Sequence, residues 1–462
     1  MELNDELRAI VGDAGVLDAA AVSERSAGFM RLDNLRARVL VRPADTEEVS
    51  RVLGFCHRRG LAVVTQGGLT GLVHGAEAGA ADVILSLERM RGIEAIDPMQ
   101  RTATVQGGVT LQALQEAVDQ HDLSFPLDLG ARGAATLGGI AATNAGGNRV
   151  LRYGMVRDMI LGLEVVLADG TIIDSLNQLL KNNTGYDLKQ WFIGSEGTLG
   201  VITRLVLRLR ERPRSQDVAL AALPSFEAVA RFLKHMDASM GGRLSAFEVM
   251  WPSFYRLVTT PPAKGKPPVA ADHAFYVLVE SQGADIERDS ARFGEALEAA
   301  AVSGLVVDAA IAKCQDECNA LWSLRDDVGL VAIGGAPIIF DISLPIARMQ
   351  SYTENLAKAL QQDIGEHRLW IFGHLGDGNL HLIVQVKPED HARLRPKIEA
   401  LAYGPLAAFR GAVSAEHGIG LEKKPWLSIS RGEQEIALMR RMKRALDPNG
   451  VLNPGKLVDS PA

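Results

Sequence analysis

The opening third of the chain alternates short apolar runs with helical periods. Val39 to Val41 is a run typical of a strand, and Asp45 just after it has the side chain of a helix N-cap. Apolar residues then recur at helical spacing from Val49 to Arg58. Residues 61–65 predict a second strand, which runs directly into Gly67-Gly68. A strand that feeds a glycine-rich turn is a common place for phosphate binding in folds of this kind.

The pattern continues with more strands and one long irregular segment. Residues 80–110 predict short strands, and residues 112–120 predict a helix. Residues 125–155 are rich in glycine and have little regular period. A segment of this length without regular structure is usually functional. Strands return at 163–167 and 201–207.

A charged, proline-containing break at residues 210–215 marks a predicted domain boundary. Beyond it, predicted strands at 218–222, 274–280 and 370–372 alternate with predicted helices at 225–237 and 288–301. This alternation predicts a separate α/β domain. A last helix is expected at 434–446. We therefore divide the chain into a first domain at 1–213, a second domain at 214–412 and a C-terminal segment at 413–462.

Composition excludes several classes of protein. The chain has 462 residues and a formal net charge of −7, which argues against nucleic-acid binding. No run of about 18 apolar residues predicts a membrane span. The N-terminus lacks the basic and apolar regions of a secretory signal, and three cysteines are too few for a disulfide framework. We therefore expect a cytoplasmic protein, with the oligomeric state left open and a homodimer included.

Three glycine-rich loops lie at residues 66–71, 130–147 and 194–200. One such loop alone would be an ordinary tight turn, whereas three in one domain indicate a backbone that closely approaches a ligand. No Gly-x-Gly-x-x-Gly joins a strand to a helix, so this is not a dinucleotide fingerprint of the Rossmann type. Residues 450–456 imitate a P-loop, but Leu457 stands where a serine or threonine is required after Lys456.

A histidine pair indicates a metal site. His374 and His381 flank the sequence Leu-Gly-Asp-Gly-Asn-Leu between two apolar runs, and Asp377-Gly378 is a strong signal for a two-residue hairpin turn. That register places the two histidines opposite each other on one face. Glu416 offers a third ligand, and two histidines with one carboxylate suit catalytic zinc as well as ferrous iron. The alternative is a pair of ordinary polar residues at a hairpin.

The combined motifs resemble the FAD domain of the vanillyl-alcohol-oxidase-type flavoproteins. The resemblance is carried by Gln66–Gly71, Gly138–Gly147, Tyr153-Gly154 and Gly194–Thr203. Within that group the chain is most similar to the D-lactate, glycolate and D-2-hydroxyglutarate dehydrogenases. The resemblance implies an α+β fold: an FAD-binding domain of two subdomains, built from both ends of the chain, around an inserted substrate (cap) domain.

The resemblance also implies roles for individual residues. His417 matches the catalytic histidine of the family, and Arg325 in Trp322-x-x-Arg325 matches its substrate arginine; by residue type alone, Arg325 would be a surface arginine paired to an aspartate. His374, His381 and Glu416 match the positions that bind a divalent metal, usually zinc. The residues implied to hold FAD are Gln66, Gly67, Gly68, Thr70, Gly71, Pro126, Gly130, Thr136, Gly138, Gly139, Thr143, Asn144, Gly147, Tyr153, Gly154, Glu196, Gly197, Gly200, Ile202 and Asn453.

Departures from the family pattern refine this expectation. His74 lies at the wrong spacing for a covalent flavin anchor, so we expect noncovalent FAD. Ile339 stands where relatives specific for hydroxyglutarate have a lysine, which favours D-lactate or longer monocarboxylates.

The expected reaction is oxidation of a small D-2-hydroxy acid to the 2-oxo acid. In it, hydride passes to flavin N5, the metal polarises the hydroxyl and His417 acts as general base. The electron acceptor is left open among a quinone, a cytochrome and an electron-transfer flavoprotein. The alternatives are a non-redox alkyl-transfer synthase of the same fold and a metal-dependent hydrolase.

Overall fold

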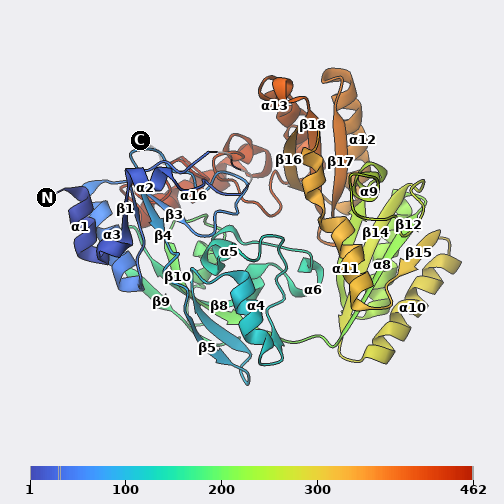
Figure 1. The fold of residues 1–462 in the computed structure, drawn as a ribbon, viewed down its shortest axis with the longest axis horizontal. Coiled ribbons are helices and arrows are strands. Elements are labelled where there is room, and N and C mark those ends of the chain that lie inside the picture. Colours follow the sequence, from blue (N-terminus) through green and yellow to red (C-terminus); the bar gives the residue numbers. More distant parts are fainter. Residues whose placement is uncertain (1, 30, 32, 460–462) are drawn as a thin grey trace. The chain divides into compact units, whose positions relative to one another are not determined.

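The computed structural model describes residues 2–29, 31 and 33–459 and divides them into two compact units (Figure 1). Unit 1 comprises Met1–Gly147, Gly154–Arg212 and Glu416–Ala462, and unit 2 comprises Asn148–Tyr153 and Pro213–Ala415. Helices and antiparallel strands occur together in the chain, so it has the α+β fold that the sequence predicts. The roles assigned to the predicted domains stay a prediction.

The first sheet of unit 1 has four strands in the order β1 (Val16–Asp18), β2 (Val39–Val41), β4 (Val83–Ser86) and β3 (Val63–Gln66). Helix α3 (Thr46–Arg59) connects β2 to β3. Its N-cap Asp45 accepts a hydrogen bond from the Glu48 amide at 2.7 Å, and the helix ends at Gly60, which has left-handed geometry. This local structure agrees with the predicted strand, helix and strand.

The second sheet of unit 1 is antiparallel, in the order β5 (Ile93–Asp97), β6 (Thr102–Gln106), β10 (Val201–Arg208), β8 (Ile160–Val166) and β9 (Ile172–Ser175). The short strands β7 (Leu123–Ser124) and β11 (Arg210–Glu211) pair separately. Helices of unit 1 are α1 (Leu3–Val11), α2 (Ala19–Ser23), α4 (Leu111–Asp119), α5 (Leu137–Thr143), α7 (Lys189–Phe192), α15 (Leu427–Ser430) and α16 (Glu433–Leu446).

The glycine-rich segment at residues 125–155 is more regular than its sequence suggests. It contains α5, for which Thr136 is the N-cap; the Thr136 hydroxyl accepts a hydrogen bond from the Gly139 amide at 3.4 Å. The helix ends at Asn144, whose φ is 49°. Two glycines and two alanines among its seven residues conceal the helical period, because small side chains give little apolar spacing to recognise.

Unit 2 is built on a seven-stranded sheet in which neighbouring strands run antiparallel. Its order is β15 (Asp308–Ile311), β12 (Ser215–Leu223), β14 (Phe275–Gly283), β13 (Leu244–Met250), β17 (Arg368–His374), β18 (Asn379–Val386) and β16 (Ala336–Ser343). Its helices are α6 (Val150–Tyr153), α8 (Phe226–Met240), α9 (Pro252–Thr259), α10 (Ile286–Val302), α11 (Gln315–Asp326), α12 (Ile346–Asp363), α13 (Pro388–Tyr403) and α14 (Leu406–Phe409). One core cluster combines alternate residues of β12 and β14 with apolar side chains of α9 and α11.

The short segment Asn148–Tyr153 is anchored in unit 2 by a buried ion pair. The Arg149 guanidinium donates to the Glu280 carboxylate through Nε at 2.8 Å and Nη2 at 3.1 Å. Glu280 is fully buried in β14 and also accepts hydrogen bonds from Ser245 and from the indole of Trp322. A half-buried residue from the glycine-rich part of the sequence is therefore bonded to a buried carboxylate of unit 2.

Candidate active site

The two histidines of the predicted metal site lie on one hairpin, in a register that differs from the predicted one. Phe372, rather than His374, is paired with His381 across β17 and β18. The connection is the four-residue stretch Leu375–Gly378, so the predicted two-residue turn is wrong. Leu375 is fully buried, and the Gly378 amide donates to the Leu375 carbonyl at 3.1 Å. The turn therefore includes Leu375 and is longer than the predicted two residues.

The shift in register preserves the predicted face. Side chains on a strand alternate between faces with a period of two, so a shift of two residues returns each side chain to the same side. His374 and His381 are diagonal neighbours with ring centroids 5.3 Å apart. Both side chains are at least nine-tenths buried.

Glu248 connects the predicted metal ligand His374 to the predicted substrate arginine. It lies opposite His374 where β13 pairs with β17. One carboxylate oxygen is 2.7 Å from His374 Nδ1, and the other accepts a hydrogen bond from Arg325 Nε, also at 2.7 Å. Arg325, on α11, is only 5% exposed, and its Nη2 lies 3.3 Å from His374 Nε2. The alternative of a surface arginine paired to a neighbouring aspartate therefore does not hold.

The electrostatics of this triad favour charge on the carboxylate. Burial raises the pKa of Glu248, but the nearby His374 and Arg325 outweigh it and bring the pKa down to about 2. An ionised carboxylate beside Nδ1 favours the tautomer in which Nδ1 carries the proton. The lone pair then lies on Nε2, which is the arrangement that metal-binding histidines adopt.

Glu416 and Asp341 complete the set of possible metal ligands. Glu416 follows directly after Ala415, whose amide donates to the Asp341 carbonyl at 3.4 Å. His374, His381 and Glu416 each offer one ligand atom, and these atoms lie within 4.8 Å of one another; Asp341, Glu416 and His417 form a second group by the same criterion. Two histidines and a carboxylate suit a divalent metal such as zinc.

Sequence reasoning missed both Glu248 and Asp341. Asp341 is fully buried, is paired with His381 across β16 and β18, and accepts a hydrogen bond from the Asn379 side chain at 2.9 Å. Each carboxylate interrupts an otherwise apolar strand, Phe247-Glu248-Val249 and Phe340-Asp341-Ile342. A buried carboxylate requires a partner, so a charge within an apolar run was the available signal.

The predicted FAD residues lie in unit 1, apart from Tyr153, which belongs to unit 2. The loops at 66–71 and 130–139 approach each other closely: a Cβ on Gly68 would lie 1.8 Å from the Ala134 carbonyl oxygen. In contrast, a Cβ added to Gly71 or Gly130 would meet no atom of the described residues within 4 Å. The described protein therefore gives no packing reason for glycine at these two positions, whereas a bound cofactor against the backbone would.

Other predicted cofactor residues have side chains that bond within the protein. The Gln66 amide donates to the Ala76 carbonyl at 2.9 Å, and the Tyr153 hydroxyl donates to Gln282 at 2.9 Å. Asn144 accepts a hydrogen bond from the Arg157 amide at 3.2 Å. These bonds position the loops and leave the cofactor roles of the three residues untested.

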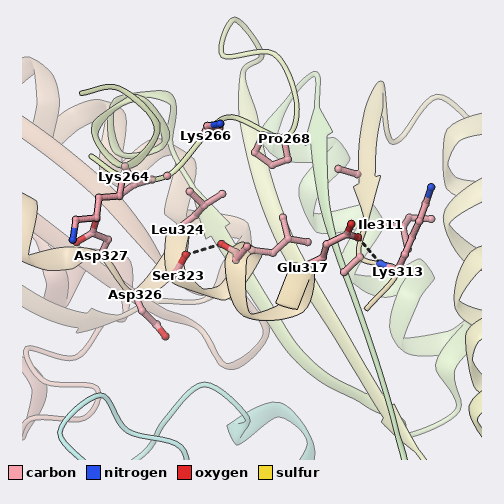
Figure 2. Close-up of a pocket in the computed structure, with 16 residues that line it drawn as sticks. Lys264, Lys266, Pro268, Ile311, Lys313, Glu317, Ser323, Leu324, Asp326 and Asp327 are labelled. Carbon is pink, nitrogen blue, oxygen red and sulfur yellow. Dashed lines mark hydrogen bonds between the residues drawn. The ribbon is translucent and has the colours of Figure 1, made fainter. Parts of the chain in front are cut away.

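Unit 2 also contains a pocket of about 960 Å³ beside α11 (Figure 2). Figure 2 shows Glu317, Ser323 and Leu324 of α11 together with the loop that carries Lys264 and Lys266. Arg325 is not among its lining residues, so this pocket is separate from the Glu248–His374 group.

The chain matches two family descriptions that together cover most of its length. Residues 37–175 match the "FAD binding domain", and residues 212–457 match "FAD linked oxidases, C-terminal domain". The protein is 39% identical over 457 residues to a mitochondrial D-2-hydroxyglutarate dehydrogenase of Bos taurus, an alignment that covers 99% of this chain and 83% of that one. It is 37% identical to a protein of Schizosaccharomyces pombe that bears the name of a mitochondrial D-lactate dehydrogenase, with coverage of 98% and 89%.

Solved structures support the predicted fold. The chain superposes on p-cresol methylhydroxylase with a TM-score of 0.76 and 17% identity, covering 98% of this chain and 96% of that one. At this identity the similarity concerns the fold alone.

The relatives correct one expectation. The names of both curated relatives place them in the mitochondrion, so the expectation of a cytoplasmic protein is wrong. Among the described residues, no helix combines the length and the apolar character needed to cross a membrane.

The near full-length match to these relatives and the match to both family descriptions lead to one conclusion. The chain belongs to the FAD-linked oxidase family, among the D-2-hydroxyglutarate and D-lactate dehydrogenases, and is an FAD-dependent oxidoreductase that acts on a CH–OH group.

Proposed function

We propose that the protein oxidises a small D-2-hydroxy acid to the 2-oxo acid with the help of a divalent metal. The observation that carries this proposal is the buried triad of Arg325, Glu248 and His374. The Glu248 carboxylate orients both the Arg325 guanidinium, which is suited to binding a substrate carboxylate, and the His374 imidazole, which is suited to binding a metal. The 39% identity to a D-2-hydroxyglutarate dehydrogenase favours this reaction over a metal-dependent hydrolase and over an alkyl-transfer synthase of the same fold.

Arg325 would hold the carboxylate that every 2-hydroxy acid carries. Its hydrogen bond to Glu248 uses Nε, and its contact with His374 uses Nη2, so Nη1 has no partner among the described residues. A guanidinium that is largely removed from water binds an anion more strongly than an exposed one. Glu248 fixes the guanidinium plane, so little side-chain freedom would be lost on binding.

His374, His381 and Glu416 would hold the metal, which supplies Lewis acidity at the substrate hydroxyl. Nε2 of His374 has one lone pair, and Arg325 Nη2 lies 3.3 Å from it. A metal and the guanidinium therefore exclude each other at this atom. We expect metal binding to move Arg325 away from His374 while its bond to Glu248 remains.

His417 would take the hydroxyl proton as general base. Its imidazole groups with the carboxylates of Glu416 and Asp341, with one atom of each within 4.8 Å of the others. An imidazole is suited to accepting a proton near neutral pH. FAD, when bound in unit 1, supplies the hydride acceptor.

Ile339 is our candidate for the position that selects the substrate. It lies on the same face of β16 as Asp341, two residues along, and is half-buried against the apolar core of unit 2. Placing a second carboxylate beside it without a partner would cost several kcal/mol. We therefore expect D-lactate and longer D-2-hydroxy monocarboxylates to compete well with D-2-hydroxyglutarate.

An anaerobic titration tests the reaction, and steady-state kinetics test the substrate. D- and L-2-hydroxy acids are added to the purified flavoprotein while the flavin absorbance is followed; only the D-acids should bleach it. kcat/KM is then compared for the D-2-hydroxy C3 to C6 monocarboxylates, D-2-hydroxyglutarate and D-malate. A preference for dicarboxylates greater than about tenfold, roughly 1.4 kcal/mol, would exclude Ile339 as the specificity position. A flavin that no D-2-hydroxy acid reduces would exclude the reaction itself.

A further inference from the structure

Glu196 has a backbone conformation that glutamate rarely adopts. Its φ is 53°, within the left-handed region, between Gly194 and Gly197, whose φ values are 79° and 70°. A residue with a Cβ loses about 1–2 kcal/mol in this conformation, and glycine would lose almost none. A glutamate in so unfavourable a conformation points to a role for its side chain.

The backbone of Glu196 is held by two distant segments of unit 1. Its amide donates to the Ala142 carbonyl at 2.8 Å, and its carbonyl accepts a hydrogen bond from the Asn453 side chain at 2.6 Å. Asn453 in turn accepts a hydrogen bond from the Thr65 amide at 3.0 Å. The position of Glu196 is therefore fixed independently of its carboxylate.

The carboxylate of Glu196 binds the turn that follows His417. One oxygen accepts a hydrogen bond from the Ile419 amide at 2.8 Å, and the other accepts one from the Gly420 amide at 2.7 Å. The residue is 9% exposed. Burial raises the pKa of this carboxyl, and the two N–H groups act against that rise. Both carboxylate oxygens of Glu196 therefore hold the backbone of the turn at Ile419 and Gly420.

The same carboxylate explains a glycine in the Glu416-His417-Gly418-Ile419-Gly420 motif. A Cβ on Gly418 would lie 2.9 Å from a carboxylate oxygen of Glu196, and Gly418 has a φ of 83°. The positive φ favours glycine directly after His417, and a Cβ there would also displace the Glu196 carboxylate. The turn and the carboxylate therefore fit each other closely.

We propose that Glu196 is a positioning residue, which fixes the backbone after His417 and so sets the place of its imidazole. This role rests on the proposed function of His417 as general base. It differs from the cofactor contact that the family resemblance implies for Glu196. An error of about 1 Å in the placement of a reacting group can lower a rate by about a hundredfold, so the holding of this turn matters for catalysis.

Glu196→Gln in the holoenzyme tests the proposal. Glutamine keeps the size of the side chain, but its amide has a single oxygen, and its NH2 group would face the second backbone N–H. We expect flavin reduction to slow by roughly 10- to 100-fold in stopped-flow experiments. The FAD content and KM should stay within about twofold of the wild-type values. Glu116→Gln, an exposed residue of α4, is the matched control and should leave all three unchanged.

Two further measurements separate positioning from a general structural effect. Hydrogen exchange of the peptide containing Ile419 and Gly420 should be faster in Glu196→Gln than in the control variant, because both amides lose or weaken their acceptor. The double variant Glu196→Gln/His417→Asn should reduce flavin no more slowly than His417→Asn alone, since Glu196 acts through His417.

Each alternative outcome has a distinct meaning. The positioning role would be overturned, and the proposed function left intact, by any of three results. These are rate losses that add in the double variant, unchanged hydrogen exchange in Glu196→Gln, and a lower FAD content of Glu196→Gln with an unchanged rate of flavin reduction. Full speed in His417→Asn alone would overturn the proposed function of His417, and this role of Glu196 with it.

Discussion

Replacing Glu248 with glutamine is a quantitative test of the buried triad. The substitution preserves volume and removes the charge that Arg325 and His374 share. The pKa of Glu248 is about 2 against an ordinary value of 4.5: burial raises it, and the two basic partners more than compensate. A difference of this size corresponds to about 3 kcal/mol in favour of the carboxylate. Because the pKa is lowered in the folded state, this contribution is complete above about pH 4.5 and is lost as the pH falls toward 2.

We expect Glu248→Gln to lower the free energy of unfolding by about 3 kcal/mol at pH 7, since removing one partner of a buried pair leaves Arg325 without compensation. The assay is urea unfolding of the apoprotein, combined with hydrogen exchange of the β13 peptide, which reports on unit 2 directly. Glu354→Gln on α12 is an exposed control and should change the unfolding free energy by less than about 0.5 kcal/mol.

A second variant makes the reasoning refutable. In Glu248→Gln/Arg325→Met, the cation that would be stranded is also removed, so part of the lost stability should return. A loss below about 1 kcal/mol in Glu248→Gln, or a double variant that loses the full sum of the single changes, would show that the triad is not the stabilising arrangement we infer.

Four further predictions concern the cofactor, the metal, the base and one buried lysine. Acid precipitation should release intact FAD, and flavin retained on the polypeptide would contradict noncovalent binding. Chelation or His381→Ala should abolish turnover and leave FAD bound; full activity in metal-free protein would refute the metal site. His417→Asn should slow flavin reduction by roughly 10²- to 10⁴-fold with metal content kept, as stopped-flow and metal analysis can show. Burial lowers the pKa of Lys456 from 10.5 to about 8, with Asp82 and Glu77 acting against that change. Between these two pH values the unfolded chain binds more protons than the folded one. The unfolding free energy of the apoprotein should therefore rise from about pH 8 to pH 10.5, by at most about 3 kcal/mol. Urea unfolding measures this rise, which Lys456→Met should lack.

Local signals in the sequence predicted the elements that local interactions determine. Asp45 as an N-cap and the apolar period after it were sufficient to predict α3 between two strands. The hairpin was predicted in part: its two-residue period fixed the face shared by His374 and His381, whereas the burial of Leu375 decided the length of the turn. Burial of one turn residue depends on the rest of the domain and has no local signature.

The missed carboxylates follow the same rule. Glu248 and His374 are 126 positions apart, and only the pairing of β13 with β17 brings them together. A single sequence gives a charge within an apolar run but not the strand order that decides its partner. Arg325 was predicted by resemblance, while its attachment to Glu248 required the fold.

The ion pair between Arg149 and Glu280 has a consequence for dissecting this protein into parts. A gene fragment spanning 213–415 looks like a self-contained module, yet it would omit the guanidinium that neutralises a fully buried carboxylate of β14. Breaking such a pair costs about 3–5 kcal/mol, a large share of the stability of an ordinary domain. Exchange of this module between relatives, by recombination or by design, would therefore have to transfer two separate gene segments. One encodes Asn148–Tyr153 and the other encodes residues 213–415.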